Sequence, residues 1–80
     1  MKEKILEIIA SVSATDKTPE ELGEEMKLID DLSIDSLEFV HMILIFESTF
    51  NIKFDDEYIN MEKLATVKDV INYVEEKTKK

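Results

Sequence analysis

Residues 36–50 read SLEFVHMILIFESTF and decide the fold of this 80-residue chain. Nine of the fourteen positions from 37 to 50 are apolar, and they recur at the spacing of an α-helix. Asp35 is a favourable N-cap, and Glu38, three residues later, can complete a capping arrangement at the positive end of the helix. Asn51 follows the last apolar residue. The stretch therefore predicts a helix from residue 36 to residue 50.

The apolar residues of this helix fall on two arcs when they are placed on a wheel at ~100° per residue. The broader arc has the width of a core stripe and consists of Phe39, Met42, Ile43, Phe46 and Phe50. The narrower arc, on the side of Ser36, consists of Leu37, Val40 and Leu44, with Glu47 at its border. A surface helix needs only one apolar face. Two interpretations therefore stay open: the helix is packed on two sides, or the narrower arc is exposed and docks partners.

The flanking sequence predicts further helices. Apolar residues recur at helical spacing at Met1, Ile5, Ile8, Ile9 and Val12, which predicts a first helix over about residues 2–14. Thr66, with Asp69 three residues later, predicts the start of a last helix whose apolar stripe is Val67, Val70, Ile71 and Val74. A short helix is expected near residues 55–61. Since the chain has one glycine and one proline, these elements predict an all-α fold in a single domain, residues 1–80.

A long connection over residues 19–35 leads directly to Ser36. Its apolar side chains are expected to pack on the core, and they are Leu22, Met26, Leu28, Ile29, Leu32 and Ile34. Loops of this length in compact domains are usually functional. The long connection therefore indicates that Ser36, at its end, is a candidate functional residue.

Composition excludes several classes of function. A formal charge of −9 argues against nucleic acid and against an anionic membrane surface, and it suits partners with basic patches. The chain has no cysteine, which excludes disulfides and thiolate metal sites. It has one histidine, which argues against a catalytic zinc site. Neither a signal peptide nor a membrane span is recognisable, so a cytoplasmic protein is expected.

Two chemical roles for the region of Ser36 can be set aside. His41, the only histidine, lies ~140° around the helix from Ser36, so no nucleophile and base pair forms and no enzyme is expected. Asp31, Ser33 and Asp35 fall at the first, third and fifth positions of a calcium loop, but the required glycine and glutamate are replaced by Ser36 and Met42. No metal site is expected. An exposed hydroxyl at a helix start remains as a point of attachment, where the helix end favours a phosphate.

Residues 28–37, LIDDLSIDSL, resemble the attachment motif of acyl carrier proteins, in which Asp-Ser-Leu opens the second helix. The resemblance covers nearly the whole chain in length, acidity and helix order. It implies a four-helix bundle with a long loop between helices 1 and 2 and a short third helix. It also implies a 4'-phosphopantetheine on Ser36, transferred from coenzyme A by a separate phosphopantetheinyl transferase. Acyl intermediates would be carried on it as thioesters, in a fatty-acid or a specialised acyl or polyketide pathway.

The same resemblance implies roles for other residues. Recognition of the transferase and of acyl-processing enzymes with basic patches is assigned to Asp35, Leu37, Glu38, Val40, Leu44 and Glu47. The space where an acyl chain shelters is assigned to the core residues Met42, Phe46, Phe50 and Phe54. The protein is expected to be a monomer without catalytic activity and without stable membrane association.

The chain also departs from the family pattern. Ser33 stands where a glycine is usual, and His41, Ser48 and Thr49 stand where fatty-acid carriers are commonly acidic. These departures keep a specialised pathway open beside fatty-acid synthesis. From another class of function, the alternative is an acidic helical module that binds a basic partner without covalent modification.

Overall fold

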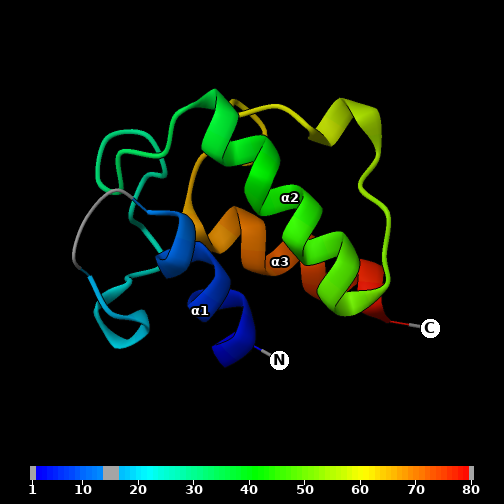
Figure 1. The fold of residues 1–80 in the computed structure, drawn as a ribbon, viewed down its shortest axis with the longest axis horizontal. Coiled ribbons are helices and arrows are strands. Elements are labelled where there is room, and N and C mark those ends of the chain that lie inside the picture. Colours follow the sequence, from blue (N-terminus) through cyan, green and yellow to red (C-terminus); the bar gives the residue numbers. More distant parts are fainter. Residues whose placement is uncertain (1, 14–16, 80) are drawn as a thin grey trace.

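The computed structural model describes residues 2–13 and 17–79, which form three α-helices and two short 3-10 turns. The α-helices are α1 (Lys2–Val12), α2 (Ser36–Phe50) and α3 (Val67–Thr78), and the 3-10 turns are η1 (Pro19–Glu21) and η2 (Asp56–Tyr58). Within these described ranges no strand occurs apart from one isolated bridge. The predicted all-α class is therefore confirmed, and Figure 1 shows the arrangement.

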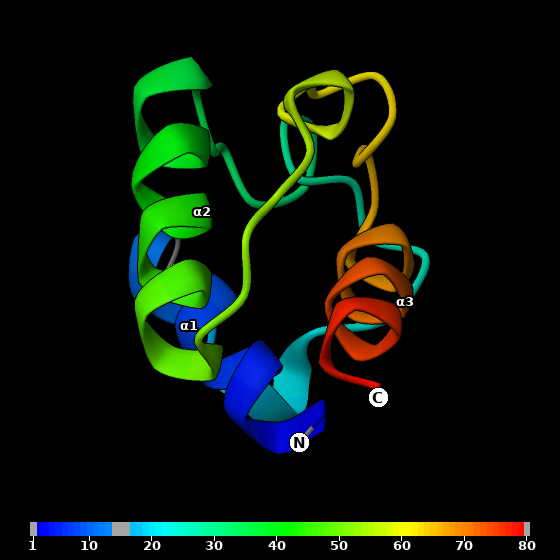
Figure 2. The same cartoon turned by 90° about the vertical axis from the view of Figure 1, so that its right-hand side faces the viewer.

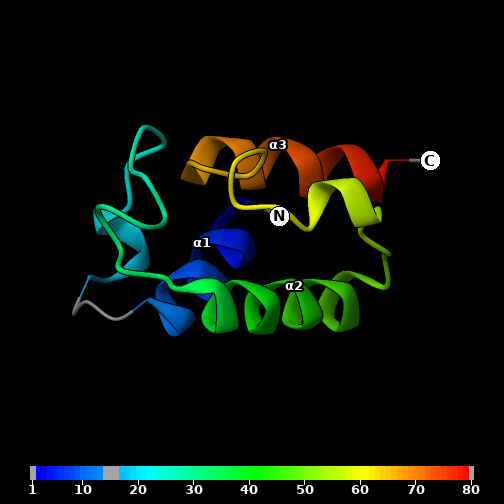
Figure 3. The ribbon, with the colours of Figure 1, turned by 90° about the horizontal axis from the view of Figure 1, so that it is seen from above.

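The three α-helices enclose one apolar core. Figures 2 and 3 show α2 and α3 on opposite sides of the molecule, and α1 packs against both. The buried stripe of α1 is Ile5, Ile8, Ile9 and Val12, and that of α3 is Val67, Val70, Ile71 and Val74. Because burial of apolar surface is the dominant favourable term in folding, these predicted stripes determine which face of each helix turns inward.

The first helix ends earlier than predicted. Helix α1 stops at Val12, and the N–H of Ser13 is shared between the carbonyl oxygens of Ile9 at 3.1 Å and Ala10 at 3.3 Å. Such sharing tightens the last turn of a helix and ends the regular pattern. Met1 and Ala14, also part of that prediction, lie outside the described residues.

The short helix expected over residues 55–61 is only the three-residue turn η2. Asp55 is in the N-cap position, but its side chain makes no capping hydrogen bond. Its carboxylate instead accepts hydrogen bonds from Lys77 Nζ at 3.0 Å and from the Tyr73 hydroxyl at 3.3 Å. The side chain that would start a longer helix is therefore bound to α3.

Helix α2 has the predicted bounds. The Asp35 carboxylate accepts a hydrogen bond from the Glu38 N–H at 2.8 Å, and the chain leaves the helix at Asn51 in the left-handed conformation. Both are common ways to satisfy helix ends. α2 is the most apolar helix, yet no described helix has the length and apolar character needed to cross a membrane.

The long loop before α2 is anchored to the start of α3. Its backbone exchanges hydrogen bonds with residues 65–68: Leu28 N–H with Ala65 O at 2.9 Å, Val67 N–H with Met26 O at 3.0 Å, and Lys68 N–H with Glu24 O at 3.0 Å. Lys27 and Thr66 form the isolated antiparallel bridge. These bonds hold the loop against the bundle.

The prediction that the apolar residues of this loop pack on the core is correct except at one position. Leu22, Leu28, Leu32 and Ile34 are buried and Met26 is partly buried. Ile29 is 54% exposed, so its assignment to the core is wrong. Ile29 follows Leu28 directly in a tight turn, and the bond from Leu28 to Ala65 fixes Leu28 as the inward-facing residue of the two.

Candidate functional site

Ser36 is the first residue of α2, and its side chain is exposed. Among the described residues, none forms a hydrogen bond with its hydroxyl. The capping role belongs to Asp35, whose carboxylate binds the Glu38 N–H and whose backbone oxygen accepts from the Phe39 N–H at 2.8 Å. The Ser36 hydroxyl is therefore free for chemistry at the positive end of the helix.

The loop places Ser36 at the surface by burying the residue two positions before it. Ile34 is fully buried, and its N–H donates to Leu28 O at 2.9 Å. Ser33 has a φ of 55°, in the left-handed region that favours glycine. The conformation of the loop is thus one for which glycine is suited, although the residue here is serine.

The acidic residues around Ser36 are partly occupied by the backbone. Asp31 Oδ2 accepts from the Lys27 N–H at 2.8 Å, and Asp35 Oδ1 serves the helix cap. In the described parts of the chain no group of three or more possible metal-binding side chains is found. The two carboxylates that a calcium loop would share are therefore hydrogen-bonded to their own backbone.

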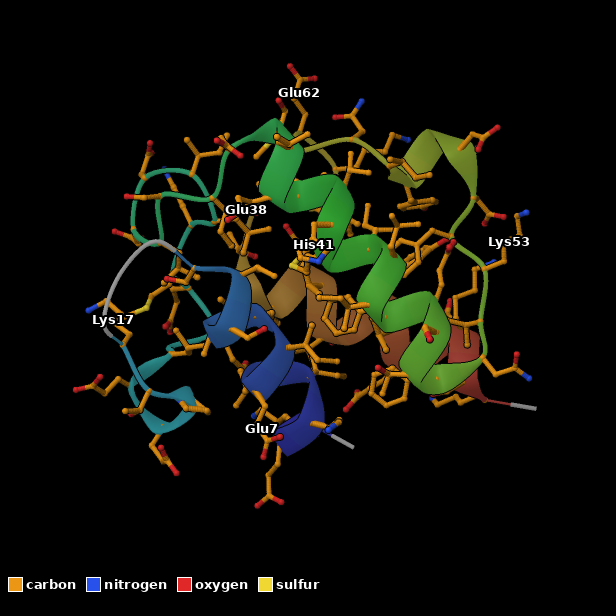
Figure 4. All side chains as sticks on the ribbon, in the orientation of Figure 1. Glu7, Lys17, Glu38, His41, Lys53 and Glu62 are labelled. Carbon is orange, nitrogen blue, oxygen red and sulfur yellow. The ribbon has the colours of Figure 1, made fainter. Side chains whose placement is uncertain are left out.

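The narrower apolar arc of α2 faces solvent. Leu37 is 80% exposed, Leu44 57% and Val40 44%, so the interpretation that α2 is packed on two sides is wrong. Glu38 and His41 lie beside this arc in the first half of α2 (Figure 4), with 3.9 Å between His41 Nδ1 and Glu38 Oε1. The result is an exposed apolar surface with carboxylates at its edge.

Glu47 differs from the other predicted recognition residues because its carboxylate is bound within the protein. Glu47 Oε2 accepts a hydrogen bond from the Phe54 N–H at 2.9 Å, and the side chain is only partly exposed. The bond joins α2 to the segment that follows it. Sequence alone could not indicate this contact, because it depends on the path of the chain after Asn51.

The four residues predicted around an acyl chain all belong to the core. Met42, Phe46 and Phe54 are buried, and Phe50 is partly buried against them. The Phe46 ring lies 6.2 Å from that of Phe50 and 6.3 Å from that of Phe54. Sequence analysis missed Tyr73 of α3, whose ring is 4.8 Å from Phe54, although its position three residues after Val70 places it beside the apolar stripe.

Asp55, Tyr73 and Lys77 form an electrostatic contact at the end of the bundle away from Ser36. The hydrogen bond from Lys77 holds the pKa of Asp55 below its usual value, and the same bond raises the pKa of Lys77. Burial raises the pKa of the Tyr73 phenol. All three shifts favour the forms that make the observed contact.

Comparison with known proteins agrees with this geometry. The family described as "Phosphopantetheine attachment site" matches residues 3–74. An acyl carrier protein of Thermotoga maritima is 42% identical over 74 residues, which cover 92% of this chain and 86% of that protein. An acyl carrier protein of Clostridium acetobutylicum is 41% identical over 76 residues (95% and 94%), and one of Chloroherpeton thalassium is 38% identical over 79 residues (99% and 94%).

The fold, the exposed serine and the family match define the class as a helical domain for phosphopantetheine attachment. Within this class, the chain belongs to the acyl carrier protein family. Membership implies a covalently attached 4'-phosphopantetheine. Members of this family are carrier proteins that interact with phosphopantetheinyl transferases and acyl-processing enzymes.

Proposed function

We propose that Ser36 is the attachment residue and that the chain presents acyl groups to other proteins from this position. The observation that carries the proposal is the exposed Ser36 hydroxyl in the first turn of α2, with helix capping left to Asp35. Among the serines that the structure describes, Ser36 alone opens an α-helix. Ser48 is also exposed on α2, but it lies near the negative end of the helix.

The residues around Ser36 suit a phosphate ester. When attached, the group supplies the thiol for thioester formation, which a chain without cysteine lacks. The start of α2 favours negative charge on the Ser36 oxygen. The hydrogen bonds that Asp35 accepts from the N–H groups of Glu38 and Phe39 hold this turn in place, and the buried Ile34 fixes the loop behind it.

The proposal assigns partner recognition to the exposed arc of α2. Leu37, Val40 and Leu44 supply apolar anchors, and Asp35, Glu38 and Glu47 supply negative charge around them. Buried apolar anchors usually dominate affinity, whereas charges at the rim mainly speed association. The expected partners are a phosphopantetheinyl transferase and acyl-processing enzymes with basic docking patches.

The proposal also gives the core a role. The acyl chain would be enclosed between α2 and α3, beside Met42, Phe46, Phe50 and Phe54. The burial of Met42 and Phe46 on α2, and of Phe54 in the segment after it, supports this assignment. In the arrangement proposed here, residues 1–80 form one carrier domain, and η2 takes the place of the short third helix in a four-helix bundle.

We propose that the protein serves fatty-acid synthesis or a specialised acyl or polyketide pathway. His41, Ser48 and Thr49 are exposed on α2 and support the specialised alternative, because they add no negative charge where a generic fatty-acid enzyme would meet it. We also propose that the protein is a cytoplasmic monomer that catalyses no reaction itself and needs no metal, nucleic acid or membrane.

The test is the intact mass of the protein after incubation with coenzyme A, magnesium and a broad-specificity phosphopantetheinyl transferase. The wild type should gain the mass of one phosphopantetheinyl group, and Ser36→Ala should gain nothing. Ser48→Ala is the matched control and should be modified as the wild type is. Ser36 makes no side-chain hydrogen bond with any described residue, so Ser36→Ala should keep its stability to within about 0.5 kcal/mol. Modification of Ser33 or Ser48, or of no residue, would contradict the proposal.

A further inference from the structure

His41 lies in the middle of the exposed face of α2. Residues three or four apart are neighbours on one face of a helix, so Leu37, His41 and Leu44 form one row. The side chain of His41 is 62% exposed. Leu37 and Leu44, on either side of it, are the two most exposed apolar residues of the arc. A titratable imidazole thus separates two of the three apolar side chains assigned to partner recognition.

Glu38 is the carboxylate that faces this imidazole. A distance of 3.9 Å separates His41 Nδ1 from Glu38 Oε1, and both side chains are exposed. In the described ranges no other carboxylate is paired with the imidazole, from α1, from the loop before α2 or from the segment after it. Glu7 of α1 pairs with Lys4 instead, and Figure 4 shows it well away from His41.

A partner that covers both leucines must also cover His41. Leu37 and Leu44 are seven residues apart, which is about 10 Å along the axis of α2, and His41 lies between them. Taking a charged group out of water costs more than taking an uncharged one, unless an opposite charge replaces the water. A basic patch supplies the same sign of charge as an imidazolium. The docked state should therefore contain the uncharged imidazole.

Glu38 does not offset this cost once a basic partner is docked. In the free protein its carboxylate favours a charged imidazole beside it. In the docked state the same carboxylate is one of the acids that would meet the basic patch. A partner's lysine or arginine paired with Glu38 would place a second cation next to the imidazolium of His41. Contact with the patch therefore requires His41 to lose its proton.

We propose that His41 is a specificity-determining residue of the docking surface, which admits a basic partner only while the imidazole is uncharged. The inference rests on the proposed function, because it takes the exposed arc of α2 as the surface that partners cover. An uncharged imidazole has one N–H donor and one acceptor nitrogen. The fitting partner sets a polar, uncharged group against His41 and its basic residues around it. A lysine or arginine at this point would find no carboxylate to pair with.

Docking should weaken as the pH falls. Histidine side chains ordinarily change charge near pH 6.5. Below this pH the free protein holds a proton that the complex must release, so protons compete with the partner. A complex that accepts only the uncharged form should bind about tenfold more weakly at pH 5.5 than at pH 7.5.

The test measures modification of the full chain by a broad-specificity phosphopantetheinyl transferase, with coenzyme A and magnesium, at pH 5.5 and pH 7.5. For each variant the KM for the carrier at pH 5.5 is divided by that at pH 7.5. The ratio for the wild type is then divided by the ratio for His41→Gln, whose side chain stays uncharged, so that titration of the transferase cancels. This quotient should be about ten, and kcat should show no such excess dependence on pH.

A relocated histidine is the matched control. His41→Gln combined with Thr49→His keeps one histidine on an exposed position of α2, but ~140° around the helix from Leu44. It gives the whole chain the same change in charge and should show no excess dependence on pH. Leu44→Ala should raise KM at both pH values and keep the wild-type quotient. Circular dichroism at both pH values checks that each variant is folded.

Three results would overturn the inference: a quotient near one, a quotient that the relocated histidine reproduces, or tighter docking at pH 5.5. The last would indicate that the partner sets a carboxylate against His41. Other readings report on the proposed function itself. A wild type that gains no mass at pH 7.5 contradicts the role of Ser36, and an unchanged KM for Leu44→Ala contradicts the exposed arc as the docking surface. When both hold, any of the three results contradicts the role of His41 alone.

Discussion

Ser36 and Leu37 at the start of α2 meet solvent, whereas Phe46 and Phe50 near its end meet other rings. Ser36 and Leu37 are exposed, and the first turn is held by the capping carboxylate of Asp35. Phe46, ten residues further along α2, is fully buried between the rings of Phe50 and Phe54. A helix anchored at one end can present the residues of its other end in a constant orientation. One end of α2 therefore exposes its residues to solvent, and the other end anchors the helix in the core.

The largest expected effect is on stability when an anchoring ring is removed. Phe46→Ala should lower the free energy of unfolding by about 3–5 kcal/mol, because it leaves a cavity between the rings of Phe50 and Phe54. A total of about 4–12 kcal/mol is expected for 80 residues, so this loss is at least about a quarter of the total. Leu37→Ala, an apolar truncation at the exposed end, should change stability by about 0.5 kcal/mol or less. Urea unfolding followed by circular dichroism measures both, and equal losses would remove the contrast.

Two glutamates of α2 provide the next contrast. Glu47→Ala leaves the partly buried Phe54 N–H without its acceptor and should lower the free energy of unfolding by about 1–3 kcal/mol. Glu38→Ala removes only an exposed contact with His41, which is worth about 0.5 kcal/mol or less. Glu47→Gln keeps an oxygen acceptor and should fall between the two. The same unfolding experiment applies, and a loss for Glu38→Ala as large as that for Glu47→Ala would argue against the anchoring role of Glu47.

Both ends of α2 are flanked by a residue with a φ of 55°, Ser33 before the helix and Asn51 after it. The left-handed conformation costs an ordinary L-residue about 1–2 kcal/mol, and asparagine tolerates it better than serine. A glycine would remove this conformational cost. Part of that gain in stability is offset by about 0.5–1 kcal/mol, because glycine adds chain entropy to the unfolded state. Ser33→Gly should therefore raise stability by about 0.5–1 kcal/mol, and Asn51→Gly by less. A thermal midpoint for Ser33→Gly below that of the wild type would show that serine contributes something glycine lacks.

The smallest effect concerns pH at the anchored end. Asp55 has a lowered pKa in the folded chain, so its contribution is present above the ordinary value of 3.8 and is lost as the pH falls through the folded value. Lys77 and Tyr73 have raised pKa values, so their contributions are present below their ordinary values of 10.5 and 10.0 and are lost as the pH rises further. Asp55→Asn should flatten the acid side of the midpoint profile relative to Asp56→Asn. Because the contact is exposed, the difference should be small.

The regular elements could be predicted from sequence because their signals are local. The bounds of α2 follow from the Asp35 cap and the apolar period, and the start of α3 follows from Thr66, whose reciprocal capping bonds with Asp69 are present. Whether the narrower arc of α2 was covered could not be predicted, since that depends on where other elements pack. The exposure of Ile29 depends on a bond between Leu28 and a residue far along the chain.

Sequence also predicts one part of the candidate site and not the other. The position of Ser36 at a helix start could be predicted, because the cap and the helix belong to one short stretch. The contact of Glu47 with Phe54 and the ring of Tyr73 against Phe54 could not, since each needs the chain to turn back after α2. Local sequence therefore describes the presenting end of the helix better than the anchored end.

The backbone bonds between the long loop and the start of α3 also set an order in time. A ribosome makes the loop well before it makes the loop's partners Ala65 and Lys68. Until then Leu28 and Glu24 lack the bonds that hold the loop against the bundle. The loop before Ser36 can therefore reach the position it has here only after residues 65–68 have been made.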